Sequence, residues 1–333
     1  MWDARLKQER AEPRVLAKRL DATRKAATTY WKWAAAGMKL RIAERVLDLA
    51  ETRMAGVRRS VELGQLAPIA VTENQRLIVE RQAILIDAQR VLQQAAIALS
   101  LFLRDEEGNP VVPGVEQLPD SLPLPRSPDL TLVPGDLSLA LQRRPELRAQ
   151  EIELERMKLQ MAGSENDLLP EFDVGVAASQ DYGDAVSDPD DKGPFEFDAF
   201  FRFQVPLQRR KAKGKLRQVE AKANKLQREI QFQKDQILAQ VQDVSLRLTQ
   251  TWARLAQIQE NAALALELER AELISLTAGQ SDLLRVNLRE QQTAKAESSL
   301  VEVITEHFQA LAEYRAFLGL TYDEVIDGRS VGE

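Results

Sequence analysis

The chain has no cysteine, a single histidine and few aromatic residues, and each shortage excludes a class of site. Without cysteine among its 333 residues, the protein can form no disulfide and can hold no cysteine-ligated metal centre. The one histidine, His307, follows Glu306 without the partners that a metal or catalytic site needs. Aromatic residues make up only 5% of the chain, which is low for a compact enzyme. We therefore expect no enzymatic activity, no cofactor and no bound metal.

Two further absences concern nucleic acid and membrane helices. The formal net charge is −6, which gives no general attraction to nucleic acid. No apolar run reaches the roughly 18 residues that a membrane-spanning helix requires. Residues 1–8 lack the apolar segment of a secretory signal. Taken alone, these absences suggest a soluble helical protein.

Glycine and proline are missing from long stretches, which predicts unusually long helices. Residues 215–278 contain neither, and a continuous helix there would be about 95 Å long. It would end at the turn 279–282, and a second helix would follow over 283–318. Residues 14–104 show the same pattern, with a break at 64–68. The predicted fold is mainly α with a small β part, built on two long antiparallel helical hairpins.

An internal repeat relates the two hairpins at an offset of 215 positions. The matched pairs include Ser60 and Ser275, Gly64 and Gly279, Gln65 and Gln280, and Phe102 and Phe317. Because both glycine turns and both Phe-Leu ends coincide in one register, we infer a duplication. Residues 1–104 are the first repeat and 138–333 the second. The segment 105–137, which carries half of the 14 prolines, is an extended connector between them.

The second repeat contains a section that the first lacks. A helix over 137–167 and a β-hairpin over 172–205 precede its long helical hairpin, which spans 207–318 and is followed by a C-terminal tail. In the repeat register Met1 falls on Leu216, so no such section precedes the first helical hairpin. We therefore expect the chain to be an N-terminally truncated fragment or to have a misplaced start.

Alternation with a period of two predicts the strands of the β-hairpin. Apolar residues alternate with acidic or polar ones, and six of the ten phenylalanines lie between positions 172 and 203. Strands of this length can cross a bilayer when tilted. The residues expected to face lipid are Phe172, Val174, Val176, Phe195, Phe197, Phe201, Phe203 and Val205. The alternative is a hairpin that packs its phenylalanine face on a soluble core.

Several short motifs, taken in their order, resemble the TolC-like outer-membrane efflux protein family. They are Tyr30-Trp31, the turn glycine Gly64, Phe102-Leu103, Val205-Pro206-Leu207, the run 208–215 and the second turn glycine Gly279. Two more are Arg144-Pro145-Glu146-Leu147, which opens a helix, and Leu168-Leu169-Pro170, which ends it. The resemblance covers nearly the whole chain. It implies a homotrimer in which each chain contributes strands to a shared outer-membrane β-barrel, and long helices form a tunnel through the periplasm.

The same resemblance assigns a role to the hairpin tips. In the family the tips close the tunnel and meet a periplasmic adaptor, which links the channel to an inner-membrane pump. The corresponding residues here are Gly64, Gln65, Gly279, Gln280, Ser281, Asp282 and Arg285. Asp282, repeated by a threefold axis, could form an acidic ring, although the nearby Arg285 leaves cation selectivity open.

Two charged segments and one alternative function complete the predictions. The basic run 209–215 lacks interleaved aromatic residues, so we expect it near lipid headgroups and not on nucleic acid. The aspartates between 181 and 191 fail the calcium-loop pattern because Lys192 and Ala199 occupy ligand positions, and a solvated loop is expected. The alternative to a channel is a soluble coiled-coil scaffold, which gives no reason for alternating strands.

Overall fold

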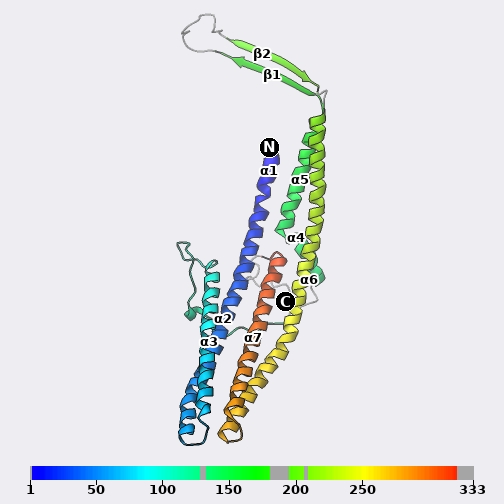
Figure 1. Ribbon diagram of the computed structural model, residues 1–333. Helices are drawn as coiled ribbons and strands as arrows, with labels where there is room; N and C mark the ends of the chain where they lie inside the picture. The colour runs from blue at the N-terminus through cyan, green and yellow to red at the C-terminus, as the bar shows by residue number, and fades with distance from the viewer. Residues whose placement is uncertain (1, 128–132, 181–194, 206–208, 321–333) are drawn as a thin grey trace, which may run out of the picture. The chain divides into compact units, whose positions relative to one another are not determined.

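The computed structural model describes residues 2–127, 133–180, 195–205 and 209–320. Its elements are α1 (Trp2–Glu9), α2 (Ala11–Glu62), α3 (Ile69–Ser100), the 3₁₀ turn η1 (Val115–Gln117), α4 (Val133–Arg143), α5 (Pro145–Asn166), β1 (Glu171–Ser179), β2 (Glu196–Gln204), α6 (Arg210–Thr277) and α7 (Leu283–Phe317) (Figure 1). The predicted class, mainly α with a small β part, is confirmed. In the described ranges, none of the helices combines the length and the apolar character needed to cross a membrane.

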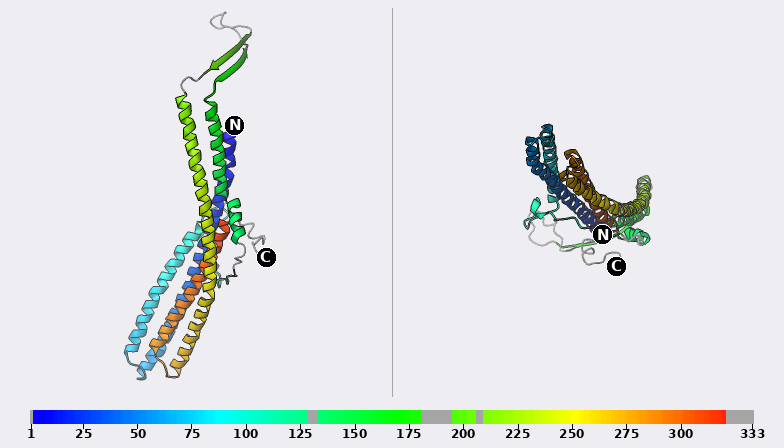
Figure 2. Two further views of the ribbon diagram at one scale, coloured as in Figure 1. Left: turned by 90° about the vertical axis from the view of Figure 1, so that its right-hand side faces the viewer. Right: turned by 90° about the horizontal axis from the view of Figure 1, so that it is seen from below.

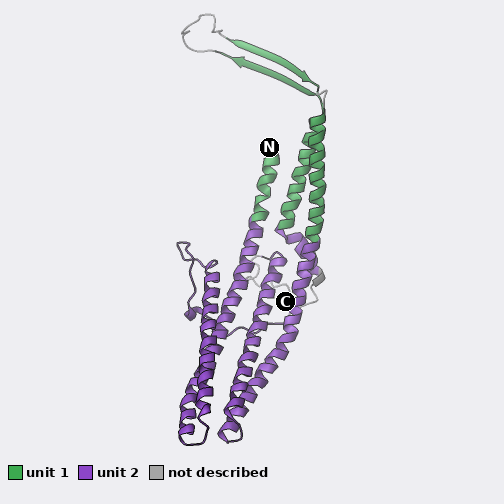
Figure 3. Ribbon diagram, in the orientation of Figure 1, with its two compact units in different colours: residues 1–14, 146–234 green, residues 15–145, 235–333 purple. Residues whose placement is uncertain are grey.

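The contacts divide the chain into two compact units, coloured separately in Figure 3. Residues 1–14 and 146–234 form the first unit, and residues 15–145 and 235–333 form the second. Helices α2 and α6 contribute residues to both. Because this division does not follow the repeat boundaries, the separation into repeats at 1–104 and 138–333 stays a prediction.

The long helices occupy the stretches where breakers are missing. Helix α6 runs for 68 residues and α7 for 35, close to the ranges expected from the sequence. The basic run belongs to the first turns of α6, because that helix begins at Arg210 and not near Lys215. Lys215 donates a hydrogen bond of 2.8 Å to Asp167, just beyond the end of α5.

Three helix boundaries differ from expectation, each for a local reason. The first third is helical from Trp2, before the expected start near residue 14. The single helix predicted over 137–167 is two helices, because Pro145 has no N–H and disfavours a helical conformation at Arg144. Helix α3 ends at Ser100 and not near residue 104, because the chain turns back and pairs Arg104 with Pro110.

Helices α2 and α7 are the central helices of the second unit. Helix α2 packs on α3 through two apolar clusters, and α7 packs on α6 through two more. Helices α2 and α7 also contact each other, since Trp31 stacks on Phe308 with ring centroids 4.2 Å apart. Helices α3 and α6 therefore occupy the outer positions of this unit (Figure 2).

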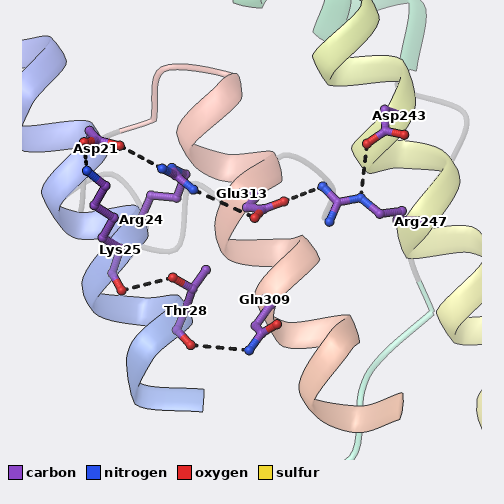
Figure 4. A network of polar contacts seen from close by, with 8 residues as sticks. All are labelled: Asp21, Arg24, Lys25, Thr28, Asp243, Arg247, Gln309 and Glu313. Atoms are coloured by element: carbon purple, nitrogen blue, oxygen red, sulfur yellow. Dashed lines mark hydrogen bonds and ion pairs between the residues drawn. The ribbon is translucent and has the colours of Figure 1, made fainter. Parts of the chain in front are cut away.

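A polar network ties three of these helices together, as Figure 4 shows. Glu313 of α7 accepts a hydrogen bond from Arg247 of α6 and pairs with Arg24 of α2 at 3.9 Å. One turn away, Gln309 donates to the backbone carbonyl of Thr28 at 3.4 Å. The two helical hairpins are thus joined by charged as well as apolar contacts.

Candidate functional site

The two hairpin tips share one backbone geometry. Gly64 and Gly279 have φ values of +72° and +71°, a conformation that glycine adopts with little strain. Gln65 N–H donates to the Ser60 carbonyl at 2.9 Å, and Gln280 N–H donates to the Ser275 carbonyl at the same distance. Both tips therefore end their first helix in a Schellman motif, which satisfies carbonyls that the helix leaves free. The repeat register at an offset of 215 reproduces these hydrogen bonds pair by pair.

The tips differ in how the second helix of each hairpin begins. Helix α3 follows Pro68, which makes no side-chain cap. Helix α7 follows Asp282, whose Oδ1 accepts from the backbone N–H of Arg285 at 2.9 Å. Glu272 is mostly buried, accepts a hydrogen bond from Ser281 and pairs with Arg289 at 3.5 Å. The second tip is thus held by side chains, whereas the first depends on its backbone.

A buried ion-pair cluster near the tips was missed in the sequence. Glu290 of α7 is only 1% exposed and pairs with Arg53 of α2 and with Arg81 of α3, the latter at 2.7 Å. Arg81 also donates to the Val46 carbonyl, and Arg53 donates to Asn287 at 2.6 Å. Glu290 lies between Val286 and Thr293 on the buried stripe of α7. An acidic residue at a position of the helix that is expected to be buried was the sequence signal for this cluster.

The antiparallel register of β1 and β2 places the predicted apolar residues on one face. Phe172 lies opposite Phe203, Val174 opposite Phe201, and Ala178 opposite Phe197. Phe195 and Val205 continue the same alternation just outside β2. The eight residues expected to face lipid are between 42% and 75% exposed. These side chains therefore form an apolar face that no described part of the chain covers.

The opposite face of the β-hairpin is polar, with one aromatic exception. Asp173 lies opposite Arg202, and Phe200 lies opposite Gly175. A Cβ added at Gly175 would come within 2.3 Å of the Phe200 ring, so the ring lies directly over the glycine backbone. The Arg202 guanidinium is 5.7 Å from the centroid of the same ring. The two faces of one hairpin thus present contrasting chemistry.

The single histidine and the aspartate-rich loop are the remaining candidate groups. His307 is buried against α6, with Nδ1 3.1 Å from Thr251 Oγ1, and burial lowers the pKa of its imidazole. The described residues contain no cluster of three or more side chains that could hold a metal ion. The aspartate-rich loop 181–191 lies outside the described residues.

Comparisons with protein families and with curated proteins find no match. Solved structures do match over most of the chain. A membrane protein from Pseudomonas aeruginosa is 18% identical with a TM-score of 0.83, covering 98% of this chain and 72% of that one. The open-state MtrE outer membrane channel of Neisseria gonorrhoeae is 18% identical with a TM-score of 0.80, covering 96% and 70%. The outer membrane protein VceC of Vibrio cholerae is 17% identical with a TM-score of 0.79, covering 96% and 75%.

These similarities confirm the resemblance that the order of the sequence motifs indicated, and the roles of the tip and strand residues stay predictions. At this level of identity they establish the fold and not the role of any residue. The chain has the fold of the TolC-like outer-membrane efflux channels.

Proposed function

We propose that the chain is a protomer of a trimeric outer-membrane efflux channel. Its helices would line a periplasmic tunnel, and its two strands would join a barrel shared between three copies. The channel would be passive and need no cofactor, because a pump in the inner membrane would supply the energy. The fold shared with MtrE and VceC supports this proposal.

The exposed apolar face of β1 and β2 is the observation that carries the proposal. Each strand has nine residues, which at about 3.3 Å per residue extend roughly 30 Å. Tilted by about 35–45°, such a strand covers about 21–25 Å of depth, close to the apolar band of about 25 Å in membrane barrels. An isolated hairpin is only marginally stable in water, and exposed phenylalanines add to the cost. Lipid on one face and neighbouring strands at both edges would remove that cost. A coiled-coil scaffold has no use for this face.

The outer helices of the second unit support association between copies. Val79, Ile86 and Ile97 share one exposed stripe of α3, at spacings of seven and eleven residues. On α6, Leu246, Leu264 and Leu268 share another. If the two different apolar surfaces pair between copies, the contact is head-to-tail and favours a ring over a two-fold dimer.

The tips would form the gate of the tunnel and the contact with a periplasmic adaptor. Their exposed residues are Gly64, Gln65, Gly279, Gln280, Asp282 and Arg285, with Ser281 half-buried against Glu272. Asp282 caps α7 through Oδ1, and its Oδ2 pairs with the Arg285 side chain at 3.9 Å, so a ring of this residue would present carboxylates that are already partly neutralised. The backbone-held first tip would be the easier of the two to remodel.

Membrane insertion of the strands provides the test. We expect the purified chain to have three times its 37.5-kDa mass in detergent and to float with lipid vesicles. Phe201→Arg puts a charge on the apolar face, where it costs about 2–4 kcal/mol and lowers the floating fraction at least tenfold. Phe200→Arg changes the neighbouring residue on the polar face and is the matched control.

The control variant should float like the unmodified chain. A monomer that stays in solution, or equal effects of the two substitutions, would refute the channel and favour the scaffold.

A further inference from the structure

The connector crosses from the first helical hairpin to the second within five residues. Leu118 is 7% exposed and belongs to the apolar cluster between α2 and α3, together with Trp33 and Leu99. Leu122 packs against the cluster between α6 and α7, which includes Leu255 and Val303. One short segment therefore contacts the cores of both hairpins inside the second unit.

The seat of Leu118 is shaped by a glycine and an arginine of α2. A Cβ at Gly37 would lie 2.5 Å from Leu118 Cδ2, so no larger residue fits without displacing that side chain. Glycine weakens a helix interior, and this close approach gives a reason for its presence. One turn further, Arg41 donates from Nη1 to the carbonyls of Pro119 and Asp120 at 2.9 and 2.7 Å. The first hairpin thus holds the connector by side chain and backbone.

The segment between Leu118 and Leu122 is barely longer than the distance it has to span. Four residues from Leu118 to Leu122 span at most about 14 Å when fully extended. Neighbouring helices pack with their axes about 8–10 Å apart, so the reach exceeds one helix spacing by only a few ångströms. Pro119 has a fixed φ, which narrows the range of lengths that the segment can adopt. While both leucines stay seated, the hairpins cannot move far apart at this level.

The two ends are held unequally. Leu118 is buried in its seat and backed by the two Arg41 hydrogen bonds, whereas Leu122 is only partly buried against its cluster. We propose that residues 118–122 are a strap that limits the separation of the two helical hairpins, and that Leu122 is its releasable end. The strap would act in this way in a channel or in a scaffold, so it does not depend on the proposed function.

Spin labels on the tips test the strap, because the chain has no cysteine of its own. Gln65→Cys and Gln280→Cys place one label on each tip, and dilution with unlabelled chain restricts the measurement to distances within one molecule. Glu290→Gln is included in the labelled chain, since its buried ion pairs also join the hairpins. In that background Leu122→Ser should broaden the tip-to-tip distance distribution roughly twofold. Leu124→Ser, at a leucine 65% exposed, should leave the distribution unchanged.

A second label pair distinguishes release of the strap from general loosening. Arg58→Cys and Thr72→Cys lie on α2 and α3 of the same hairpin, and their distance should not respond to Leu122→Ser. If Glu290→Gln destabilises the chain too far, Arg53→Gln takes its place, because it removes one of the two ion pairs of Glu290 and leaves the carboxylate paired with Arg81. A tip-to-tip distribution that ignores Leu122→Ser, or a within-hairpin distance that broadens equally, would overturn the strap.

Discussion

Glu290 is a single buried charge that connects three helices of the bundle. It forms ion pairs with Arg53 of α2 and Arg81 of α3, in a site almost closed to water. Pairs of this kind contribute little net stability compared with apolar residues, but breaking one leaves uncompensated charge behind. The cluster therefore imposes one register on α2, α3 and α7.

Replacing this carboxylate should be far more damaging than replacing an exposed one. Glu290→Gln leaves two buried arginines without their counter-charge and should lower the free energy of unfolding by about 3–5 kcal/mol. Glu302→Gln breaks the exposed pair with Lys39, 2.5 Å long, and should cost less than about 1 kcal/mol. Denaturant titration of both variants measures the difference. Equal losses would show that the buried cluster has no special role.

At the scale of elements, the tips depend on backbone conformation more than on side chains. The left-handed glycines at 64 and 279 end α2 and α6 with the same pair of hydrogen bonds. Any other residue there would hold its Cβ close to a carbonyl oxygen. The matched geometry explains why the repeat is easiest to recognise at the tips.

Substitution of alanine for glycine should therefore have opposite effects within one helical hairpin. Gly64→Ala imposes left-handed backbone on alanine and should destabilise the chain by about 1–2 kcal/mol. Gly56→Ala lies inside α2 with nothing within 4 Å of the new Cβ, and should stabilise it by about 0.5–1 kcal/mol. Thermal unfolding followed by circular dichroism reports both. A destabilising Gly56→Ala would contradict the conclusion that Gly56 lies in a regular helix with open space around its Cα.

At the scale of the whole molecule, two outer helices carry apolar stripes that one chain does not cover. Helix α3 offers a close comparison, because Ile84 and Ile86 are both exposed but point to different sides. Ile84 lines a cavity of about 550 Å³ bounded by α2, α3 and α7 of the same chain. Ile86 belongs to the outer stripe and is available to another copy.

Assembly should respond to only one of these isoleucines. Ile86→Asp introduces a charge into the proposed contact between copies and should weaken trimer formation at least tenfold, which corresponds to about 1.4 kcal/mol. Ile84→Asp should leave the trimer intact. Light scattering over a range of concentrations measures the effect, with helicity as the check on folding. A trimer insensitive to Ile86→Asp would place the contact elsewhere.

Some features follow from sequence because they are local. Long stretches without glycine or proline produce α6 and α7, and strict alternation produces β1 and β2. The single helix expected over 137–167 was wrong, although the resemblance had already indicated that a helix opens at Arg144-Pro145, where α5 begins. Reasoning from local patterns also missed Glu290, because helical spacing alone does not show which face becomes buried.

The sequence by itself determined the long helices, the hairpin tips and the two faces of the β-hairpin. Each follows from residues near one another: the absence of helix breakers, a left-handed glycine, and period-two alternation. Only the tertiary structure decided which helices pair, that Glu290 meets two arginines, and that Leu118 and Leu122 reach different hairpins. The contacts between α2 and α7 include the hydrogen bond from Gln309 to Thr28, which lie 281 positions apart. The position of α2 beside α7 comes from packing complementarity across the unit, and no local pattern encodes it.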